Sequence, residues 1–372
     1  MAIAGTNIKL DNSEGMDKIT SIEKVTSPYH SDGTETLLAA SIVSTSLSDT
    51  NENYFFGISN SATATTTEWN VAFGSTNGFG SLIEANTKAE TEAIYKQYAS
   101  ILLAPTEVTG GFFISRNTST ATVPSNAKVS SGKDQEIFVL SARRTNMKDR
   151  INKGTWTVAL SGSSTADEKT PASLLELTDD SVNDTPTATP VGDRYNIVSG
   201  SAGTIVNAAT DRTYGFFYPD MGIMVFSAAE LSSSIPGKGA NKAEVVTFDN
   251  PLHKGFGFSS DTNANEKTAL RLVNCLQPVG AKLSFRDEED QVSAQYFCRV
   301  RSGQANFSNN PTFVSGSENK LRVEKMRGNP NTFITSVQLY NDNQEMVAVA
   351  NLSTPLKKNF SSEATIKVKL TY

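Results

Sequence analysis

Histidine, cysteine and tryptophan are scarce in this 372-residue sequence, which has two residues of each type. His30 lies in a polar segment and His253 in a loop after Pro251, and neither is surrounded by a catalytic or metal-binding motif. A histidine-based catalytic triad or zinc site would therefore have few possible members. We expect structural or solvent-exposed roles for both histidines.

The two cysteines, Cys275 and Cys298, are too few to form a disulfide framework. No apolar run approaches the roughly 18 residues that a membrane helix needs. Residues 1–10 lack the basic segment and apolar core of a secretory signal. We therefore expect a soluble protein made in the cytoplasm, with reduced thiols and no membrane partner.

Charged residues are also few, since they make up 19% of the chain, below the roughly 25% of an ordinary soluble protein, and the net charge is -6. Neutralising a phosphate backbone needs clustered Lys and Arg, so this balance excludes a strongly basic nucleic-acid binder. In place of charges the chain has 42 Ser, 40 Thr and 30 Asn. These side chains compete for backbone hydrogen bonds and disfavour long helices, so the composition predicts a β-rich protein.

The distribution of apolar runs divides the chain into three parts. Residues 1–32 are interrupted throughout by polar and turn residues, and we expect an N-terminal arm, mobile in the free subunit, that acts as an assembly clamp on a neighbour. Residues 33–255 are expected to form a β-rich domain with one amphipathic helix, and residues 256–372 a helix and an antiparallel β domain. The predicted class is mainly β with two or three helices (α+β), in β-sandwich-like domains with an antiparallel C-terminal β domain.

Two segments have helical signals. Residues 87–102 begin with capping-box spacing and are followed by a proline. The apolar face predicted for this helix contains Ile94, Tyr98, Ile101 and Leu102. Residues 265–276 are predicted to be a second helix, and the inward residues expected for it are Ala269, Leu272, Val273 and Leu276.

Short apolar runs bounded by Ser, Thr, Asn and Gly predict many buried strands. The predicted strands are residues 37–43, 54–58, 71–73, 110–115, 136–142, 156–160, 174–177, 195–198, 214–218, 223–226, 282–285, 294–300, 321–325, 332–340, 345–352 and 364–370. Residues 219–222 have the Pro and Gly spacing of a hairpin turn, and residues 341–344 are a second hairpin loop.

Three loops match ligand-binding patterns only in part. The Gly-Lys pairs at 132–133 and 237–238 lack the glycine that a phosphate-binding loop has five positions upstream. Residues 261–265 match the first ligands of a calcium loop, but Glu266 occupies the position of its required glycine. We predict no cofactor and no metal site.

Four consecutive carboxylates, Asp287, Glu288, Glu289 and Asp290, form the densest acidic cluster. Such a cluster can serve as a general acid and base or can bind a hard cation. Because it lies between two predicted strands, we favour a solvated hairpin tip.

A basic run precedes the strand that contains Trp156. It consists of Arg143, Arg144, Lys148, Arg150 and Lys153. The run is interpreted as a solvated loop or as a contact with an acidic partner; the interleaved Asp149 and the lack of aromatic residues weaken a nucleic-acid interpretation. The acidic and basic residues are the only candidates for partner contacts, and no catalytic residue is predicted.

The last third of the chain resembles a virion structural protein family of marine contractile-tailed phages, including cyanophages. The segments that carry the resemblance are YFCRV at 296–300, NFSNNPTF at 306–313, ITSVQLY at 334–340, VAVANLSTP at 347–355 and IKVKL at 366–370. Weaker similarity is present in IYKQ at 94–97 and GTWTV at 154–158.

The resemblance implies a structural component of a tailed-phage virion, in the tail or baseplate, that acts through protein–protein contacts and is not an enzyme. Its partners would be other virion proteins, in a symmetric assembly with multiple copies, put together in the host cytoplasm; it would bind no nucleic acid and no membrane. A neck or capsid-associated protein is an alternative. A carbohydrate-binding fibre or adhesin module is another, but it would need exposed Trp and Tyr platforms, and the chain has only two tryptophans, Trp69 and Trp156, the second of them on a strand that is expected to be buried. A degradative tail enzyme would need perturbed carboxylates around residues 287–290.

Overall fold

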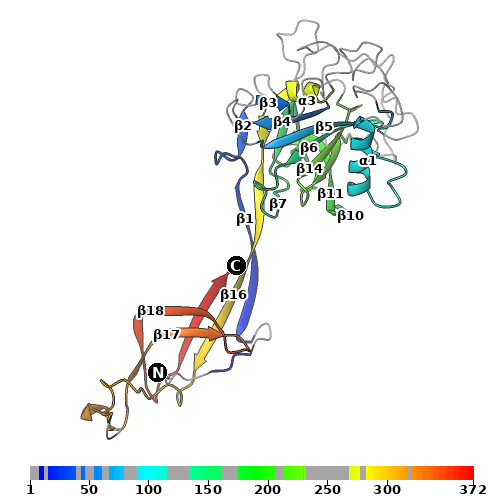
Figure 1. Cartoon of the computed structure of the whole chain (residues 1–372). Coiled ribbons are helices and arrows are strands. Elements are labelled where there is room, and N and C mark those ends of the chain that lie inside the picture. The colour runs from blue at the N-terminus through cyan, green and yellow to red at the C-terminus, as the bar shows by residue number, and fades with distance from the viewer. Residues whose placement is uncertain are drawn as a thin grey trace. The chain divides into compact units, whose positions relative to one another are not determined.

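Figure 1 shows the computed structural model of the whole chain. The structure describes residues 8–11, 16–38, 43–46, 54–60, 67–78, 90–114, 134–160, 174–206, 213–228, 230–231, 268–276, 282–316, 318 and 320–372. The expected class is confirmed in its main feature, because the protein is mainly β and its sheets are antiparallel. The strands are β1 (Lys18–Pro28), β2 (Thr36–Leu38), β3 (Val43–Ser46), β4 (Phe55–Ser59), β5 (Trp69–Ser75), β6 (Glu136–Ala142), β7 (Arg150–Ile151), β8 (Thr157–Leu160), β9 (Leu175–Asp179), β10 (Thr187–Thr189), β11 (Gly192–Ser201), β12 (Thr204–Ile205), β13 (Gly215–Tyr218), β14 (Ile223–Ser227), β15 (Lys282–Ser284), β16 (Arg286–Val300), β17 (Thr332–Tyr340), β18 (Met346–Lys358) and β19 (Ala364–Thr371).

Helical structure is sparse, and the predicted two or three helices are not matched in full. Within the described residues, α1 (Glu90–Leu102) is the one helix of more than three turns. The other helical segments are α3 (Thr268–Leu276), with nine residues, and η3 (Glu324–Met326), a single 3-10 turn.

The chain divides into two compact units. Unit 1 contains residues 1–24 and 290–372, and unit 2 contains residues 25–289. The boundaries fall inside β1 and β16, not after residues 32 and 255 as the sequence suggested. The reason is the sheet order β1-β16-β19, in which β16 is hydrogen-bonded to β1 on one side and to β19, the last strand, on the other.

The main sheet of unit 2 is one continuous sheet that curls into a half-barrel, in place of the expected sandwich of two sheets. Its strand order is β2-β15-β8-β9-β11-β13-β14-β6-β5-β4-β3, with β10 and β12 paired to β11. The two edge strands, β2 and β3, are consecutive in the sequence, and only residues 39–42 separate them. A chain of this length spans at most about 17 Å, so the two edges of the sheet must approach each other.

Both faces of the central strands of this sheet are buried, which explains why β6, β13 and β14 are continuous apolar runs. Along β6, Phe138 and Leu140 belong to one buried cluster, while Ile137 and Val139 belong to a second cluster on the opposite face. The first cluster also contains α3, which packs against β4, β5 and β8. The four residues predicted to point inward from this helix are all buried, as expected.

Helix α1 covers the other face, beside β5 in Figure 1, but it is rotated relative to the prediction. Of the face predicted for it, Leu102 is buried and Ile94 and Tyr98 pack half-buried against the second cluster, as expected. Ile101 is exposed, and Tyr95 and Ala99 are buried in its place. A Cβ atom on Gly74 would lie 3.0 Å from the Cα of Tyr95, so the helix backbone rests directly on a glycine of β5. The hydroxyl of Tyr95 donates to the carbonyl of Asp134 at 2.8 Å and fixes this rotation.

Residues 16–32 are not the loosely packed arm that the sequence suggested. Residues 18–28 form β1, and Tyr29 and His30 are 1% and 3% exposed. The Tyr29 ring lies 4.9 Å from Trp69 and 6.2 Å from Phe285, measured between ring centroids. Ile and Val alternate irregularly with Ser and Thr in β1, so no apolar period marks it, yet β-branched residues favour a strand. Residues 1–7 and 12–15 lie outside the described part of the chain.

The C-terminal β structure of unit 1 is antiparallel, as predicted. Strands β16 and β19 pair from Ser293 with Thr371 to Val300 with Ala364, and β17 pairs with β18 in a sheet of their own. In unit 2, the predicted turn at 219–222 joins β13 to β14, and Gly222 adopts a φ of 65°. Two predicted strands are absent from the described residues: residues 111–114 are irregular, and residues 324–326 form η3.

Candidate functional site: a polar network between β7 and β16

The acidic run is not a hairpin tip. It lies inside β16, and Asp287 and Glu288 are each 3% exposed. The sequence prediction failed because the run is flanked by strand residues on both sides, and strand pairing continues through it. Glu289 and Asp290 are half-buried on the same strand.

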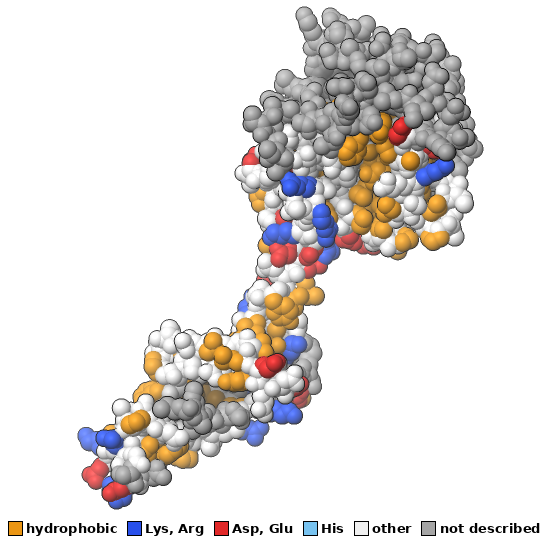
Figure 2. Space-filling model, viewed as in Figure 1, with side chains coloured by type: hydrophobic (Ala, Val, Ile, Leu, Met, Phe, Trp, Pro, Cys, Tyr) orange, Lys and Arg blue, Asp and Glu red, His pale blue; other side chains and the backbone are white. Residues whose placement is uncertain are grey.

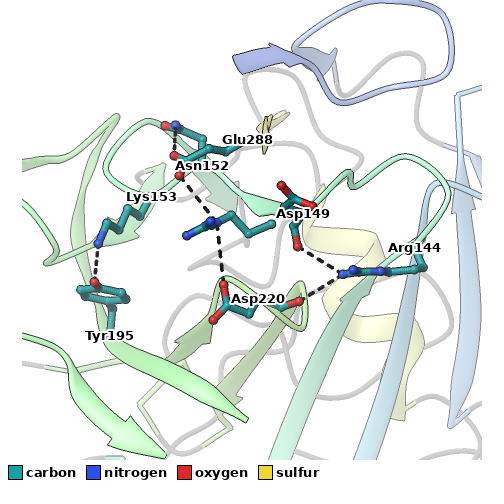
Figure 3. A network of polar contacts seen from close by, with 8 residues as sticks. Arg144, Asp149, Asn152, Lys153, Tyr195, Asp220 and Glu288 are labelled. Atoms are coloured by element: carbon teal, nitrogen blue, oxygen red, sulfur yellow. Dashed lines mark hydrogen bonds and ion pairs between the residues drawn. The ribbon is translucent and has the colours of Figure 1, made fainter. Parts of the chain in front are cut away.

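The predicted basic run faces this strand. Strand β7 pairs with β16, which places Arg150 opposite Glu288 and Ile151 opposite Asp287. The Nε atom of Arg150 lies 3.6 Å from Oε1 of Glu288. Asn152 donates from Nδ2 to Oε2 of Glu288 at 2.7 Å, so both carboxylate oxygens have a partner (Figure 3).

The turn that carries the basic residues is also tied to the β13–β14 hairpin. Arg144 donates from Nη1 to the carbonyl oxygens of Asp149 at 3.3 Å and of Asp220 at 3.2 Å. The Asp220 carboxylate lies 3.9 Å from Nε of Arg150. Figure 3 shows the Arg144 side chain reaching toward both Asp149 and Asp220.

The two lysines of the basic run have partners as well. Lys148 donates to Oε2 of Glu289 at 2.6 Å, and this hydrogen bond raises the lysine pKa. Lys153 donates to the hydroxyl of Tyr195 at 2.6 Å and lies over its ring, and the hydrogen bond raises its pKa in the same way.

Two further candidates, Asp287 and Arg143, contact the end of β1 and the residue that follows it. Asp287 accepts from the backbone N–H and the hydroxyl of Ser27 at 2.8 and 2.6 Å. The backbone N–H of Arg143 donates to the hydroxyl of Tyr29 at 2.9 Å. The structure therefore brings together the acidic and basic clusters, which the sequence presented as separate, and two ion pairs join them, Arg150 with Glu288 and Lys148 with Glu289.

This network of contacts between β7, β16 and the β13–β14 hairpin is suited to holding these elements together, and we call it the joint. The carboxylates of Asp287 and Glu288 already have partners within unit 2, since Asp287 accepts hydrogen bonds from Ser27 and Glu288 contacts Asn152 and Arg150. The joint fixes the 143–154 turn against β16 and the β13–β14 hairpin.

Sequence reasoning missed a second group of buried carboxylates, Glu68, Asp134 and Glu136. Each precedes or begins an apolar strand, and that position is the one signal that marks them. Glu68 accepts from the Ser31 hydroxyl and the Asn146 amide. Asp134 accepts from the hydroxyl of Ser227 and, at 2.7 Å, from the N–H of Ile114.

Glu136 differs from these two carboxylates. Its Oε1 atom is buried with no hydrogen-bond partner, and burial together with the charge of Asp134 raises its pKa to about 8. At neutral pH this side chain is mainly protonated. A neutral carboxyl group is the less costly state in an apolar environment.

Neither metal nor disulfide chemistry is apparent in the described residues. No group of three or more His, Cys, Asp or Glu side chains among them could hold a metal ion. Cys275 is buried, Cys298 is half-buried, and both are free thiols. His253 and the partial motifs at 132–133, 237–238 and 261–265 lie outside the described residues.

Comparisons with protein-family models, with curated proteins and with solved structures found no match to this chain. Of the helices that the structure describes, none has the length and apolar character that a membrane crossing requires.

Proposed function

We propose that this chain is a structural component of a tailed-phage virion, in its tail or baseplate, and that it acts through protein–protein contacts. The resemblance of the last third of the sequence to a phage virion family motivates the proposal. The β-rich fold and the mutually paired charged clusters are in keeping with a scaffold.

The observation that carries the proposal is the distribution of apolar side chains in unit 1. No described residue of unit 1 belongs to either buried apolar cluster. Thirteen of the nineteen exposed large hydrophobic residues lie in this unit. Apolar surface of this extent is typical of a protein that is completed by a partner.

A carbohydrate-binding module is supported less well. Both tryptophans, Trp69 and Trp156, are fully buried in unit 2, so neither can provide the exposed aromatic platform on which a sugar ring stacks. A neck or capsid-associated position in the virion would use the same kind of contacts, and the experiment below separates it from a tail position.

The proposal is tested by mass spectrometry of phage particles produced from a genome that carries this gene. After density-gradient purification, peptides of this chain should copurify with tail proteins, and should remain with tails that are separated from heads. A nonstructural phage enzyme serves as the negative control. Enrichment with heads would favour the alternative position, and absence from purified particles would contradict the proposal.

A further inference from the structure

We propose that unit 1 is a self-association module, in which the β17–β18 hairpin of one copy is buried against unit 1 of other copies of this chain. This inference rests on the proposed structural function and names its first partner, a second copy of the same chain. It follows from the burial, anchoring and charge of the described residues of unit 1.

The described residues of unit 1 do not form the apolar interior that a unit of roughly a hundred residues ordinarily needs. Its buried hydrophobic residues, within the described part, are only Ala294, Val300, Val314 and Val368. The exposed ones are Met16, Ile19, Ile22, Phe307, Val323, Phe333, Tyr340, Met346, Val347, Val349, Leu356, Phe360 and Tyr372. Burial of such side chains is the main free-energy gain of folding, so unit 1 gains its missing stability when another surface covers them.

The β17–β18 hairpin is the centre of this exposure. In the described residues its two strands pair only with each other. The successive residues Val349 and Ala350, whose side chains point to opposite faces of a strand, are both exposed. A two-stranded sheet that is open to water on both faces is only marginally stable, so this hairpin is suited to packing against a partner. Figure 2 shows orange side chains spread over this part of unit 1, with few charges between them.

The base of the hairpin is held firmly. Lys358, the last residue of β18, is fully buried. Its ammonium group donates to the carbonyl of Ser302 at 2.9 Å, to Oδ1 of Asn306 at 2.9 Å and to the carbonyl of Asn359 at 2.7 Å, which satisfies its three N–H donors. At the start of β17, the hydroxyl of Thr332 donates to the carbonyl of Ala305 at 2.5 Å. The apolar residues are therefore presented on an anchored frame, which lowers the entropy cost of binding.

The extent of the exposed surface matches an interface. Thirteen side chains that are each about half exposed leave on the order of 1,000 Å² in contact with water, and each partner in a stable complex buries roughly 800 Å². The residues lie on β1, β17, β18 and several loops, so they are not confined to one patch. Several copies in a symmetric assembly can cover such a distributed surface, because each copy offers the same residues to its neighbours.

The charge of unit 1 opposes a second copy as the partner only weakly. Unit 1 contains 13 Lys and Arg residues and 10 Asp and Glu residues, whereas unit 2 contains 20 and 29. Ion pairs within unit 1 mix the two signs, as in Lys369 with Glu23 and Arg299 with Asp17, both at 3.9 Å. Copies of unit 1, with a net charge of only +3 each, can therefore meet with little repulsion, while the net charge of -9 on unit 2 opposes contact between unit 2 of one copy and unit 2 of another. An excess of three positive charges is too small to favour a nucleic acid.

The test is the oligomeric state of the full chain, measured by sedimentation velocity over a range of protein concentrations. The wild-type protein should form a discrete oligomer heavier than the 39.9 kDa monomer. The double variant Val347→Glu/Val349→Glu should dissociate at least tenfold more readily, because it places two unpaired charges in the contact. The control Val182→Glu changes an equally exposed valine of unit 2 and should assemble like the wild type.

The emission of Trp69 and Trp156 checks that unit 2 of the variant is folded, and its far-UV circular dichroism, compared with the wild type, checks unit 1. If the variant loses unit 1 structure, hydrogen exchange of the wild-type protein tests whether the hairpin is buried on association. The β17 and β18 amides should exchange more slowly at protein concentrations where the oligomer forms. A wild-type chain that stays monomeric, or equal exchange at all concentrations, overturns the inference. A monomeric chain that is nevertheless found in virions would leave the proposed function intact, and an oligomer absent from virions would contradict the function alone.

Discussion

Arg150 and Glu288 face each other across the backbone pair that joins β7 to β16, with Nε of the arginine 3.6 Å from Oε1 of the glutamate. The two residues belong to charged clusters that lie far apart in the sequence. The two clusters, each a candidate for partner contacts, therefore meet in one network of contacts within unit 2.

Replacing Glu288 with Ala should destabilise unit 2 by about 1–3 kcal/mol, because it leaves Arg150 and Asn152 without a buried acceptor. Urea unfolding followed by tryptophan emission measures this loss. The matched control is Glu289→Ala. The Glu289 and Lys148 side chains are 33% and 45% exposed, so their pair should contribute no more than about 0.5 kcal/mol. Equal effects of the two substitutions would show that the buried joint has no special role.

The buried carboxyl group of Glu136 makes stability depend on pH. Its pKa is raised from 4.5 to about 8 in the folded protein, so between these values the folded state holds a proton that the unfolded state has released. The contribution of Glu136 to stability is therefore complete at low pH, falls as the pH rises through this window, and is lost above pH 8.

Urea titrations at a series of pH values from 5 to 9 measure this dependence. The free energy of unfolding should fall less steeply with rising pH in Glu136→Gln than in the wild type. At pH 9 this variant should be more stable than the wild type, since it never has to bury a negative charge. Glu176→Gln, at a half-exposed glutamate that pairs with Lys282, serves as the control. The same pH slope in the wild type and in Glu136→Gln would contradict the assignment.

The close contact of α1 with β5 depends on Gly74. A Cβ atom there would lie 3.0 Å from the backbone N and Cα of Tyr95, and neither atom can move without shifting the helix. We expect Gly74→Ala to cost about 1–3 kcal/mol through overpacking. The control is Gly303→Ala, since nothing lies within 4 Å of a Cβ at that position. Thermal unfolding followed by circular dichroism measures both, and a Gly74→Ala protein that melts like the control would refute the contact.

Both cysteines should be reduced thiols with different reactivity. Burial raises the pKa of Cys275, and it also raises the pKa of the half-buried Cys298. Because the thiolate is the reactive form, alkylation of the native protein should label Cys298 slowly and Cys275 more slowly still. Intact mass after alkylation in denaturant, without reductant, should show two adducts. A mass without adducts would mean that the two residues form a disulfide.

Local signals in the sequence predicted much of the fold. The apolar run at 136–142 coincides with β6, and residues 332–340 coincide with β17. The Pro and Gly at 219–222 predicted a turn, and Gly222 adopts the positive φ that the turn requires. In these cases the residues that determine the structure are neighbours in the sequence.

Long-range contacts decided the features that the sequence did not reveal. The rotation of α1 depends on Gly74 and on the carbonyl of Asp134, which are distant in the sequence from the helix they fix. Tyr29 is buried because its ring packs against the rings of Trp69 and Phe285. No periodicity in residues 1–32 indicates this contact. Pairing of the acidic run with β7 likewise could not be deduced from the composition of either segment.

The most direct test of a structural role is cryo-electron microscopy of purified phage particles that contain this chain. We predict density for multiple symmetry-related copies in the tail or baseplate, with the β17–β18 hairpin of each copy packed against unit 1 of a neighbouring copy. Particles that are complete without density for this chain would contradict the account.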